Sequence, residues 1–248
     1  MCYTDNMRYT KNSRLENLPN ILSSQGVICT CDCGKPKLPK FSNYAIQEIS
    51  ENQTKNTKIL RNRSSIFKIL NEKSRPLNIV EVGVMAGDFA SEMLSSMQIQ
   101  NLYLIDPFNI NDGAAQSETL RFTAESHLDF IIQRFNGDNR VKILQGFSEH
   151  RLVELLELQE KDKIDFIYID SNHSFKNVYN DILYATQILK SDGIIGIDDM
   201  SLFLEDPRDL SETFQSVTRF LANNKDWEVS YYSFHDNGIP NIYLSKIN

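Results

Sequence analysis

Residues 164–200, "IDFIYIDSNHSFKNVYNDILYATQILKSDGIIGIDDM", decide the fold class of this chain. Short apolar runs at 164–170 and 193–198 predict two strands, and the segment 177–190 between them predicts an amphipathic helix. A strand, a helix and a second strand in this order form a βαβ unit, whose two strands are parallel. Both predicted strands end in aspartate, and parallel strands end at the same edge of a sheet, so the acids are candidates for one site.

The same alternation of strands and helices extends over most of the chain. Further strands are predicted at 78–83, 101–106, 140–146, 227–234 and 240–247. The last two are joined by "HDNGI", whose Asn-Gly pair is a strong hairpin signal. The sequence therefore predicts a Rossmann-like α/β fold: a mostly parallel seven-stranded sheet with a C-terminal antiparallel hairpin and helices on both faces.

The N-terminal region differs from the rest in its lack of sustained periodicity. Residues 1–57 are predicted as an arm or cap with irregular and helical segments, and residues 58–248 as the main domain. All cysteines lie in this arm: Cys2, Cys29, Cys31 and Cys33. A small zinc site is one interpretation, but a second cysteine pair or histidines at ligand spacing are missing, so reduced thiols are favoured.

Composition and charge narrow the class of protein. The chain has 248 residues, of which 41% are hydrophobic and 24% are charged, as in ordinary globular domains. A formal net charge of −7 argues against an extended surface that binds the phosphate backbone of nucleic acid. No stretch has the length of a membrane span, and the N-terminus lacks an apolar signal core. We therefore expect a cytoplasmic protein without nucleic-acid or membrane partners, and homo-oligomer formation stays open.

The ends of the first three predicted parallel strands offer candidate ligand contacts. Gly83 and Gly87 in "EVGVMAGDF" bracket a tight strand-to-helix turn, which lets a ligand approach the backbone. Asp106 ends the next strand, where an acid commonly accepts hydrogen bonds from ribose hydroxyls; a turn-capping role is the alternative. Ser148 either caps the following helix or faces an adenine, and the sequence does not separate these roles.

The next two strand ends bring acids together. Asp170, Asp198 and Asp199 would repel one another unless a cation joins them, and their oxygen ligands suit magnesium, manganese or calcium. The alternative is that they cap the following loop and face water. His173, three residues after Asp170, is a candidate general base at neutral pH. The remaining histidines are predicted as surface or satisfied residues: His127, His150 and His235.

These motifs together resemble a known family. The glycine motif "VEVGVMAGDFAS", followed by "FIYIDSNHSFKNVYNDI" and "LKSDGIIGIDDM", resembles the class I S-adenosylmethionine-dependent methyltransferases. It is most similar to the metal-dependent O-methyltransferases, which include enzymes acting on catechol, caffeoyl-CoA and macrolide sugars. The resemblance covers about residues 58–248, and makes this segment a candidate methyltransferase domain.

The resemblance implies a role for each motif residue. The implied cofactor-binding residues are Glu81, Gly83 and Gly87 at the methionine end, Asp106 at the ribose and Ser148 near the adenine. The implied metal ligands are Asp170, Asp198 and Asp199. His173 falls where the sugar-directed members place a general base. Two residues depart from the family pattern: Ser171 replaces a glycine in the loop that carries His173, and Asp192 replaces the first glycine of a G-G pair.

The leading hypothesis is transfer of a methyl group from S-adenosylmethionine to a hydroxyl of a small molecule, such as a sugar, glycoside or phenol, with Mg²⁺ or another divalent cation. A hydroxylase-like enzyme or a metal-independent methyltransferase on the same scaffold is an alternative, because fold does not fix reaction. A non-catalytic cofactor-binding protein is another. The acceptor pocket is expected from the N-terminal region, "DPFNINDGAAQ" and "MSLFLEDPRD". Their apolar residues are either its wall or core: Phe108, Phe203 and Leu204.

Overall fold

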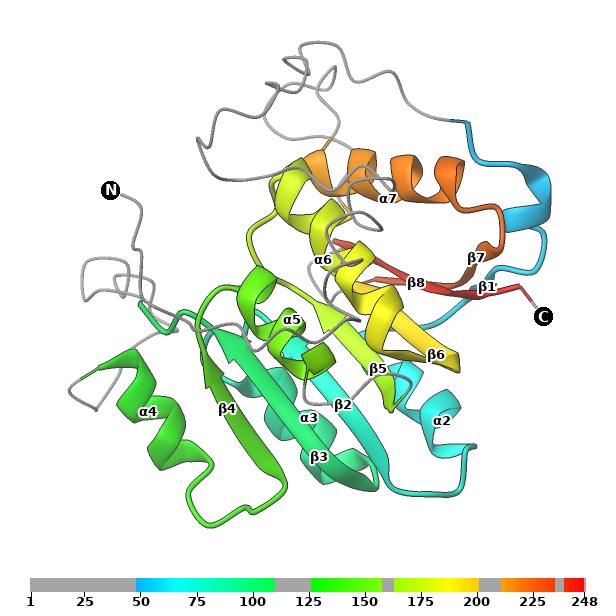
Figure 1. Cartoon of the computed structure of the whole chain (residues 1–248). Helices are drawn as coiled ribbons and strands as arrows, with labels where there is room; N and C mark the ends of the chain where they lie inside the picture. Colours follow the sequence, from blue (N-terminus) through cyan, green and yellow to red (C-terminus); the bar gives the residue numbers. More distant parts are fainter. Residues whose placement is uncertain (1–47, 110–125, 158–162, 201–210, 235–238, 248) are drawn as a thin grey trace, which may run out of the picture.

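The computed structural model describes residues 48–109, 126–157, 163–200, 211–234 and 239–247. Within them, one eight-stranded sheet has the order β1-β7-β8-β6-β5-β2-β3-β4 (Figure 1). Its strands are β1 (Lys58–Ile59), β2 (Leu77–Val82), β3 (Ile99–Asp106), β4 (Val141–Gln145), β5 (Ile164–Ile169), β6 (Leu189–Ile197), β7 (Trp227–Phe234) and β8 (Pro240–Lys246). Strands β2 to β6 pair in parallel, whereas β8 is antiparallel to β6 and β7. The predicted sheet is confirmed, with the short β1 added at its edge.

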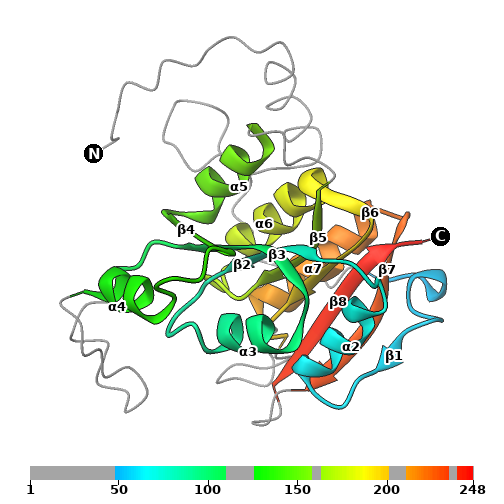
Figure 2. The same cartoon turned by 90° about the horizontal axis from the view of Figure 1, so that it is seen from below.

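Helices cover both faces of the sheet, as predicted and as Figures 1 and 2 show. They are α2 (Ile66–Asn71), α3 (Asp88–Ser96), α4 (His127–Arg134), α5 (Ser148–Glu157), α6 (Phe175–Ile188) and α7 (Glu212–Asn223). Helices α5, α6 and α7 share one hydrophobic core with the sheet. Helices α2, α3 and α4 share the core on the other face.

Strand β5 shows why the sheet is buried on both faces. Ile167 and Ile169 belong to the core under α5, α6 and α7, and Phe166 and Tyr168 belong to the opposite core. All of these side chains are at most 2% exposed. Because successive residues of a strand point to opposite faces, a continuous apolar run is required here.

Helix α7 goes beyond the elements predicted from the sequence. Ser211 caps its first turn by accepting a hydrogen bond from the Phe214 backbone N–H at 3.1 Å. Val217, Phe220 and Leu221 lie on its inner face and are fully buried. A serine cap followed by apolar residues at helical spacing is a helix signal, so this helix was predictable.

The segment before the predicted domain start packs against the C-terminal elements. A short 3₁₀ helix, η1 (Glu51–Gln53), precedes β1, and a second, η2 (Arg63–Ser65), precedes α2. Gln53 is fully buried and donates hydrogen bonds to the backbone carbonyls of Leu221 at 2.8 Å and Trp227 at 2.9 Å. The last residues of the predicted arm are therefore part of the packed structure, and the boundary at residue 58 stays a prediction.

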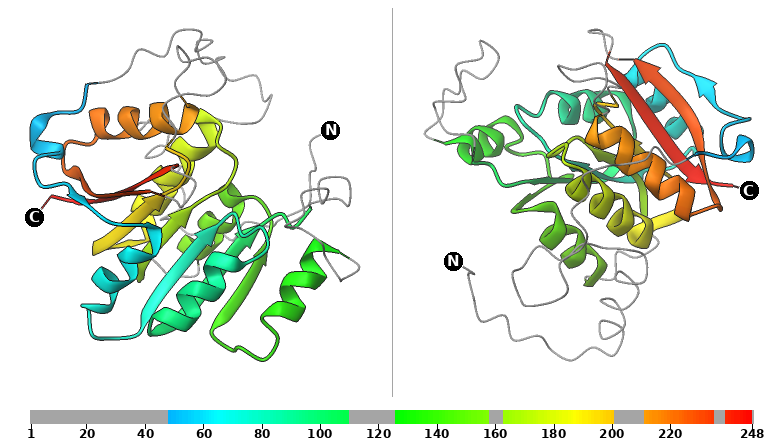
Figure 3. Two further views of the ribbon diagram at one scale, coloured as in Figure 1. Left: turned by 180° about the vertical axis from the view of Figure 1, so that it is seen from behind. Right: turned by 90° about the horizontal axis from the view of Figure 1, so that it is seen from above.

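Figure 3 shows the β7–β8 hairpin on the side of the sheet away from β4. The predicted Asn-Gly turn of this hairpin lies outside the described residues, as do all four cysteines. None of the helices in the described part of the chain combines the length and the hydrophobicity that a membrane span requires.

Candidate functional site

A cavity of about 750 Å³ opens at the carboxyl ends of the central strands. Strand order reverses between β2 and β5, because β3 and β4 follow on one side and β6 on the other. The backbone ladder continues past the strand ends, with Asp170 N donating to Val82 O at 2.8 Å. Asp198 N likewise donates to Ile169 O at 3.0 Å. Open parallel sheets bind ligands at such a reversal, and the volume suits a small molecule.

The turn from β2 to α3 forms one wall of this cavity and depends on two glycines. Gly83 and Gly87 both have positive φ, at 85° and 76°. A Cβ at Gly83 would lie 2.0 Å from the carbonyl oxygen of Asp170, so no larger residue fits while the turn packs against β5. A Cβ at Gly87 would lie 2.9 Å from the Phe135 ring. The two predicted glycines are therefore required by the backbone conformation and by close packing, and Gly83 lines the cavity.

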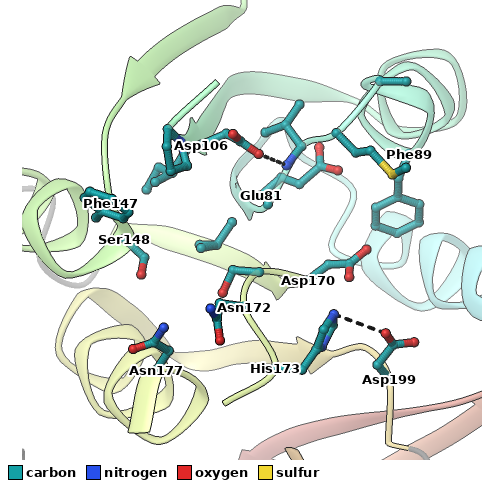
Figure 4. A pocket seen from close by; sticks show the side chains of 18 of the residues that line it. Glu81, Phe89, Asp106, Phe147, Ser148, Asp170, Asn172, His173, Asn177 and Asp199 are labelled. Carbon is teal, nitrogen blue, oxygen red and sulfur yellow. Dashed lines mark hydrogen bonds and ion pairs between the residues drawn. The ribbon is translucent and has the colours of Figure 1, made fainter. Parts of the chain in front are cut away.

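Glu81 is a buried acid that lines the cavity (Figure 4). Burial raises the pKa of Glu81 to about 8, although the nearby Arg63 guanidinium opposes this shift. Its Oε2 atom has no hydrogen-bond partner among the described residues. A buried acceptor without a partner costs free energy unless a ligand supplies a donor. Glu81 therefore fits the amino end of the methionine moiety that was predicted at this place.

Asp106, the predicted ribose-binding acid, is tied to the same glycine turn. Its Oδ2 accepts a hydrogen bond from Val84 N at 2.9 Å (Figure 4). Its Oδ1 accepts one from Phe108 N at 2.6 Å. The turn-capping alternative is thus observed. A carboxylate has about four acceptor positions, so room remains for ribose hydroxyls and the ribose role stays a prediction.

Ser148 begins α5 and lines the cavity next to Phe147, whose side chain is exposed. Ser171 Oγ donates to Asp181 Oδ2, in a buried residue of α6, at 3.0 Å, and the Ser148 hydroxyl lies near the same carboxyl group. Burial raises the pKa of Asp181 to about 7, and the two serine hydroxyls oppose that shift. Asp181 was not predicted as a site residue, because a single acid in a helix carries no motif.

The acids at the ends of β5 and β6 converge with His173. One side-chain donor atom from each of Asp170, His173 and Asp199 lies within 4.8 Å of the others. His173 Nε2 is 3.1 Å from Asp199 Oδ2 (Figure 4). Asp199 has a φ of 52°, and this left-handed turn redirects its side chain after the strand. Burial raises the pKa of Asp170 well above its ordinary value, and the neighbouring Asp198 and Asp199 raise it further.

Asp198, the third predicted ligand, is engaged differently. It is buried, and its Oδ2 lies 3.7 Å from the Arg63 guanidinium, while its Oδ1 accepts a hydrogen bond from Asp199 N at 2.8 Å. Arg63 comes from η2, lines the cavity and stacks over the Phe89 ring at 4.5 Å. It precedes every predicted strand, and no sequence pattern marked it as a site residue.

The residues present fit a divalent cation. Carboxylate oxygens are the ligands preferred by Mg²⁺, Mn²⁺ and Ca²⁺, and an imidazole extends the choice to transition metals. Asp170 and Asp199 belong both to the predicted ligand set and to the converging group. A cation would relieve the repulsion that raises the pKa of Asp170. At Asp198 it would compete with the Arg63 ion pair for the same oxygen.

Helix α4 holds the glycine turn from outside. His127, one of the histidines predicted to be surface or satisfied, is buried and its Nε2 is hydrogen-bonded to Met85 O at 2.6 Å. Arg134 donates to Ala86 O at 2.5 Å and pairs with Asp88 at 2.7 Å. These contacts fix the turn that forms one wall of the cavity.

Most of the predicted acceptor pocket lies outside the described residues, including Phe203, Leu204 and the cysteine arm. Phe108 is the exception, and it is buried core: its ring meets the His127 ring edge-on at 5.2 Å. His150 is exposed, as predicted, and His235 is not among the described residues.

Comparisons with known proteins bear on this site. Residues 80–200, which contain the glycine turn and all the converging acids, match the family model Methyltransf_24, a methyltransferase domain. An uncharacterized protein, R132, of Acanthamoeba polyphaga mimivirus is 28% identical over 176 residues, which are 71% of this chain and 71% of that protein.

One solved structure with a TM-score above 0.5 shares the fold at low sequence identity. The O-methyltransferase from Bacillus cereus, in complex with SAH, has a TM-score of 0.52 and 16% identity, and the match covers 99% of this chain and 96% of that one. Spermidine synthase from Thermotoga maritima has a TM-score of 0.47 and 14% identity over 75% of this chain. The chain spans 57% of the length of that synthase.

Proposed function

We propose that this chain, whose residues 80–200 match a methyltransferase domain, transfers the methyl group of S-adenosylmethionine to a hydroxyl of a small molecule with the help of a divalent cation. A sugar, glycoside or phenol is the acceptor class. The observation that carries the proposal is the convergence of Asp170, His173 and Asp199 in the same cavity as the glycine turn. A site for proton removal thus shares a cavity with the predicted cofactor site.

The cofactor would be held by the wall formed by β2, α3 and β3. Glu81 has an unpartnered buried oxygen for the amino group, and Asp106 has acceptor positions left for ribose hydroxyls. Ser148, with the exposed Phe147 beside it, would face the adenine. When bound, S-adenosylmethionine supplies an electrophilic methyl group on a positively charged sulfur.

The acceptor would be activated by the opposite wall. His173 would take the proton of the acceptor hydroxyl at Nδ1. Its Nε2–H would donate to Asp199 Oδ2, 3.1 Å away, which would orient the ring and stabilise its positive charge. Asp170 and Asp199 would hold the cation through carboxylate oxygens, with Asp198 as the third predicted ligand. When bound, such a cation lowers the pKa of a hydroxyl that contacts it, which makes the hydroxyl a better nucleophile.

The test is a screen of diols, glycosides and phenols with S-adenosylmethionine labelled at its methyl group. We expect label transfer to a hydroxyl oxygen, loss of transfer after chelation, and recovery when Mg²⁺ is added back. His173→Ala should lower turnover by about 10²-fold to 10⁴-fold and leave the affinity for S-adenosylhomocysteine within about threefold of wild type. Absence of S-adenosylhomocysteine binding to the wild-type protein would remove the proposal.

One observation favours a second candidate, a metal-independent methyltransferase. The Arg63 guanidinium lies 3.7 Å from Asp198 and already brings a positive charge to the acid cluster. A fixed cation of this kind stabilises neighbouring carboxylates without a metal. Transfer that survives exhaustive chelation and fails in Arg63→Gln would favour this candidate over the first.

A further inference from the structure

The role of Asp181 is not explained by the proposed reaction. This residue is in the middle of α6, is 1% exposed and does not line the cavity. The next two residues of the helix, Ile182 and Leu183, belong to the apolar core. A buried carboxyl group in such surroundings is costly, and an apolar residue would serve packing better. Its retention calls for a reason in the contacts that it makes.

Those contacts reach two walls of the cavity. Ser171 Oγ donates to Asp181 Oδ2 at 3.0 Å, and the Ser148 hydroxyl lies near enough to Asp181 to lower the pKa of its carboxyl group. Ser148 begins α5, which is the wall next to Phe147. Ser171 lies in the loop between β5 and α6, between Asp170 and His173 in the chain. One carboxyl group behind the cavity therefore interacts with a side chain from each of two separate loops that line it.

The loop that contains Ser171 also packs against the glycine turn that follows β2. A Cβ at Gly83 would lie 2.0 Å from Asp170 O and 2.9 Å from Ser171 Cα, so the glycine turn packs directly on this loop. A shift of Ser171 would therefore disturb both the turn that is predicted to hold the cofactor and the loop that presents His173. Ser171 stands where the family pattern has a glycine, and a glycine has no side chain that could donate this hydrogen bond to Asp181.

We propose that Asp181 is a positioning residue, which ties the Ser148 wall to the loop carrying His173 so that cofactor binding and ordering of this loop are coupled. The inference rests on the proposed function, since it assumes that the cofactor occupies the cavity. Asp181 touches neither cofactor nor acceptor and acts only through Ser148 and Ser171. Binding at one wall then orders the other, because both share a buried acceptor.

The test measures binding and loop order with S-adenosylhomocysteine, so that it does not depend on a known acceptor. Affinity is measured by calorimetry, and hydrogen exchange of residues 170–174 is followed with and without this ligand. In the wild-type protein we expect binding and slower exchange of that loop in the complex. Asp181→Ala should weaken binding by about tenfold, the equivalent of one hydrogen bond to a charged group, and should abolish the slowing.

Asp181→Asn keeps the shape and one acceptor oxygen, so it should recover most of the affinity and of the slowed exchange. Ser171→Ala should reproduce the loss of slowed exchange. Thr186→Ala is the matched control, because it removes a hydroxyl of the same helix that donates to Leu183 O at 2.8 Å, away from the two serines, and it should change neither quantity.

The outcomes separate the two proposals. If the wild-type protein binds no S-adenosylhomocysteine, the proposed function fails and the inference fails with it. If the wild-type protein binds it, and Asp181→Ala and Ser171→Ala leave both affinity and loop exchange unchanged, only the inference is overturned. If Asp181→Ala does not fold, unchanged affinity and unchanged loop exchange in Ser171→Ala overturn the inference in the same way.

Discussion

Strand β5 has a carboxyl group at each end, the buried Asp165 and the partly buried Asp170, and the surroundings of the two are opposite. Asp165, near the start of the strand, accepts hydrogen bonds from Arg75, from Lys190 at 2.9 Å and from the backbone N–H of Asn78 at 3.0 Å. Asp170, directly after its end, is surrounded by further acids. Burial alone would raise the pKa of Asp165, but these hydrogen bonds outweigh it and lower the pKa.

The difference separates a structural acid from a candidate functional one. The chain supplies Asp165 with enough positive charge and donors to keep it ionised and in place. At Asp170 the only arginine or lysine among the described cavity-lining residues is Arg63, which is closest to Asp198. A group whose pKa is strongly perturbed by burial and like charges, in a cavity, is a functional-site candidate. The same substitution at the two ends of β5 should therefore have opposite effects.

The largest effect on the free energy of unfolding is expected at Asp165, near the start of β5. Asp165→Asn should lower the free energy of unfolding by about 3 kcal/mol, because it removes the charge from a buried acid that serves two cations. Urea unfolding measures this loss. Asp192→Asn is the control, since Asp192 pairs with Lys73 at an exposed position and should cost less than about 1 kcal/mol. Equal losses in both variants would contradict the structural role of Asp165.

In the acid cluster that follows β5 and β6, Asp199→Asn should act on turnover and not on stability. We expect turnover to fall by about 100-fold, which corresponds to about 2.7 kcal/mol, because the variant loses a ligand charge and the partner of His173. The free energy of unfolding should stay within about 0.5 kcal/mol of wild type. Both are measured on one preparation, with methyl label for turnover and urea for unfolding. A matched loss of stability and turnover would show that Asp199 is structural.

Asp170→Asn makes the comparison with Asp165 direct. In chelator-treated protein it should raise the free energy of unfolding by about 1 kcal/mol. The reason is that it removes one of several carboxylates that repel one another at a site arranged for function and not for stability. Thermal unfolding in the presence of chelator detects a gain of this size. A loss of stability like that of Asp165→Asn would mean that the two ends of β5 do not differ.

The smallest expected effect is the loss of the stabilisation by Asp165 at acid pH. The folded-state pKa of Asp165 is lowered, so its stabilisation is present above its unfolded-state pKa of about 3.9 and is lost as the pH falls through the folded-state value. The stability gap between wild type and Asp165→Asn should therefore be constant from about pH 5 to about pH 7 and should narrow below about pH 4. Urea midpoints measured across this range test the sign, which would be wrong if the gap widened.

Much of the fold was predictable because its signals are local. The β5–α6–β6 unit shows its apolar strands and amphipathic helix in one continuous stretch, and all seven predicted strands are present. Helix α7 has equally local signals in the Ser211 cap and in the apolar spacing that begins at Val217. The two-residue β1 has no such signal, because its pairing with β7 depends on residues far along the chain.

The site was predictable only where strand ends determine it. Asp170 and Asp198 follow neighbouring parallel strands, so their proximity follows from topology. The contacts of Arg63 and Asp181 are set by tertiary packing, and no spacing rule connects Arg63 to Asp198 or Asp181 to Ser148. The same limit applies to His127, whose burial against the glycine turn depends on how α4 packs.

Calorimetric titration of chelator-treated protein with Mg²⁺, in the presence of S-adenosylhomocysteine, tests the central claim most directly. The claim is that the acids after β5 and β6 bind one divalent cation beside the cofactor. We predict one Mg²⁺ per chain for the wild-type protein and for Asp192→Asn, and no measurable Mg²⁺ binding for Asp170→Asn. Absence of Mg²⁺ binding to the wild-type protein, or equal binding to Asp170→Asn, would contradict the account.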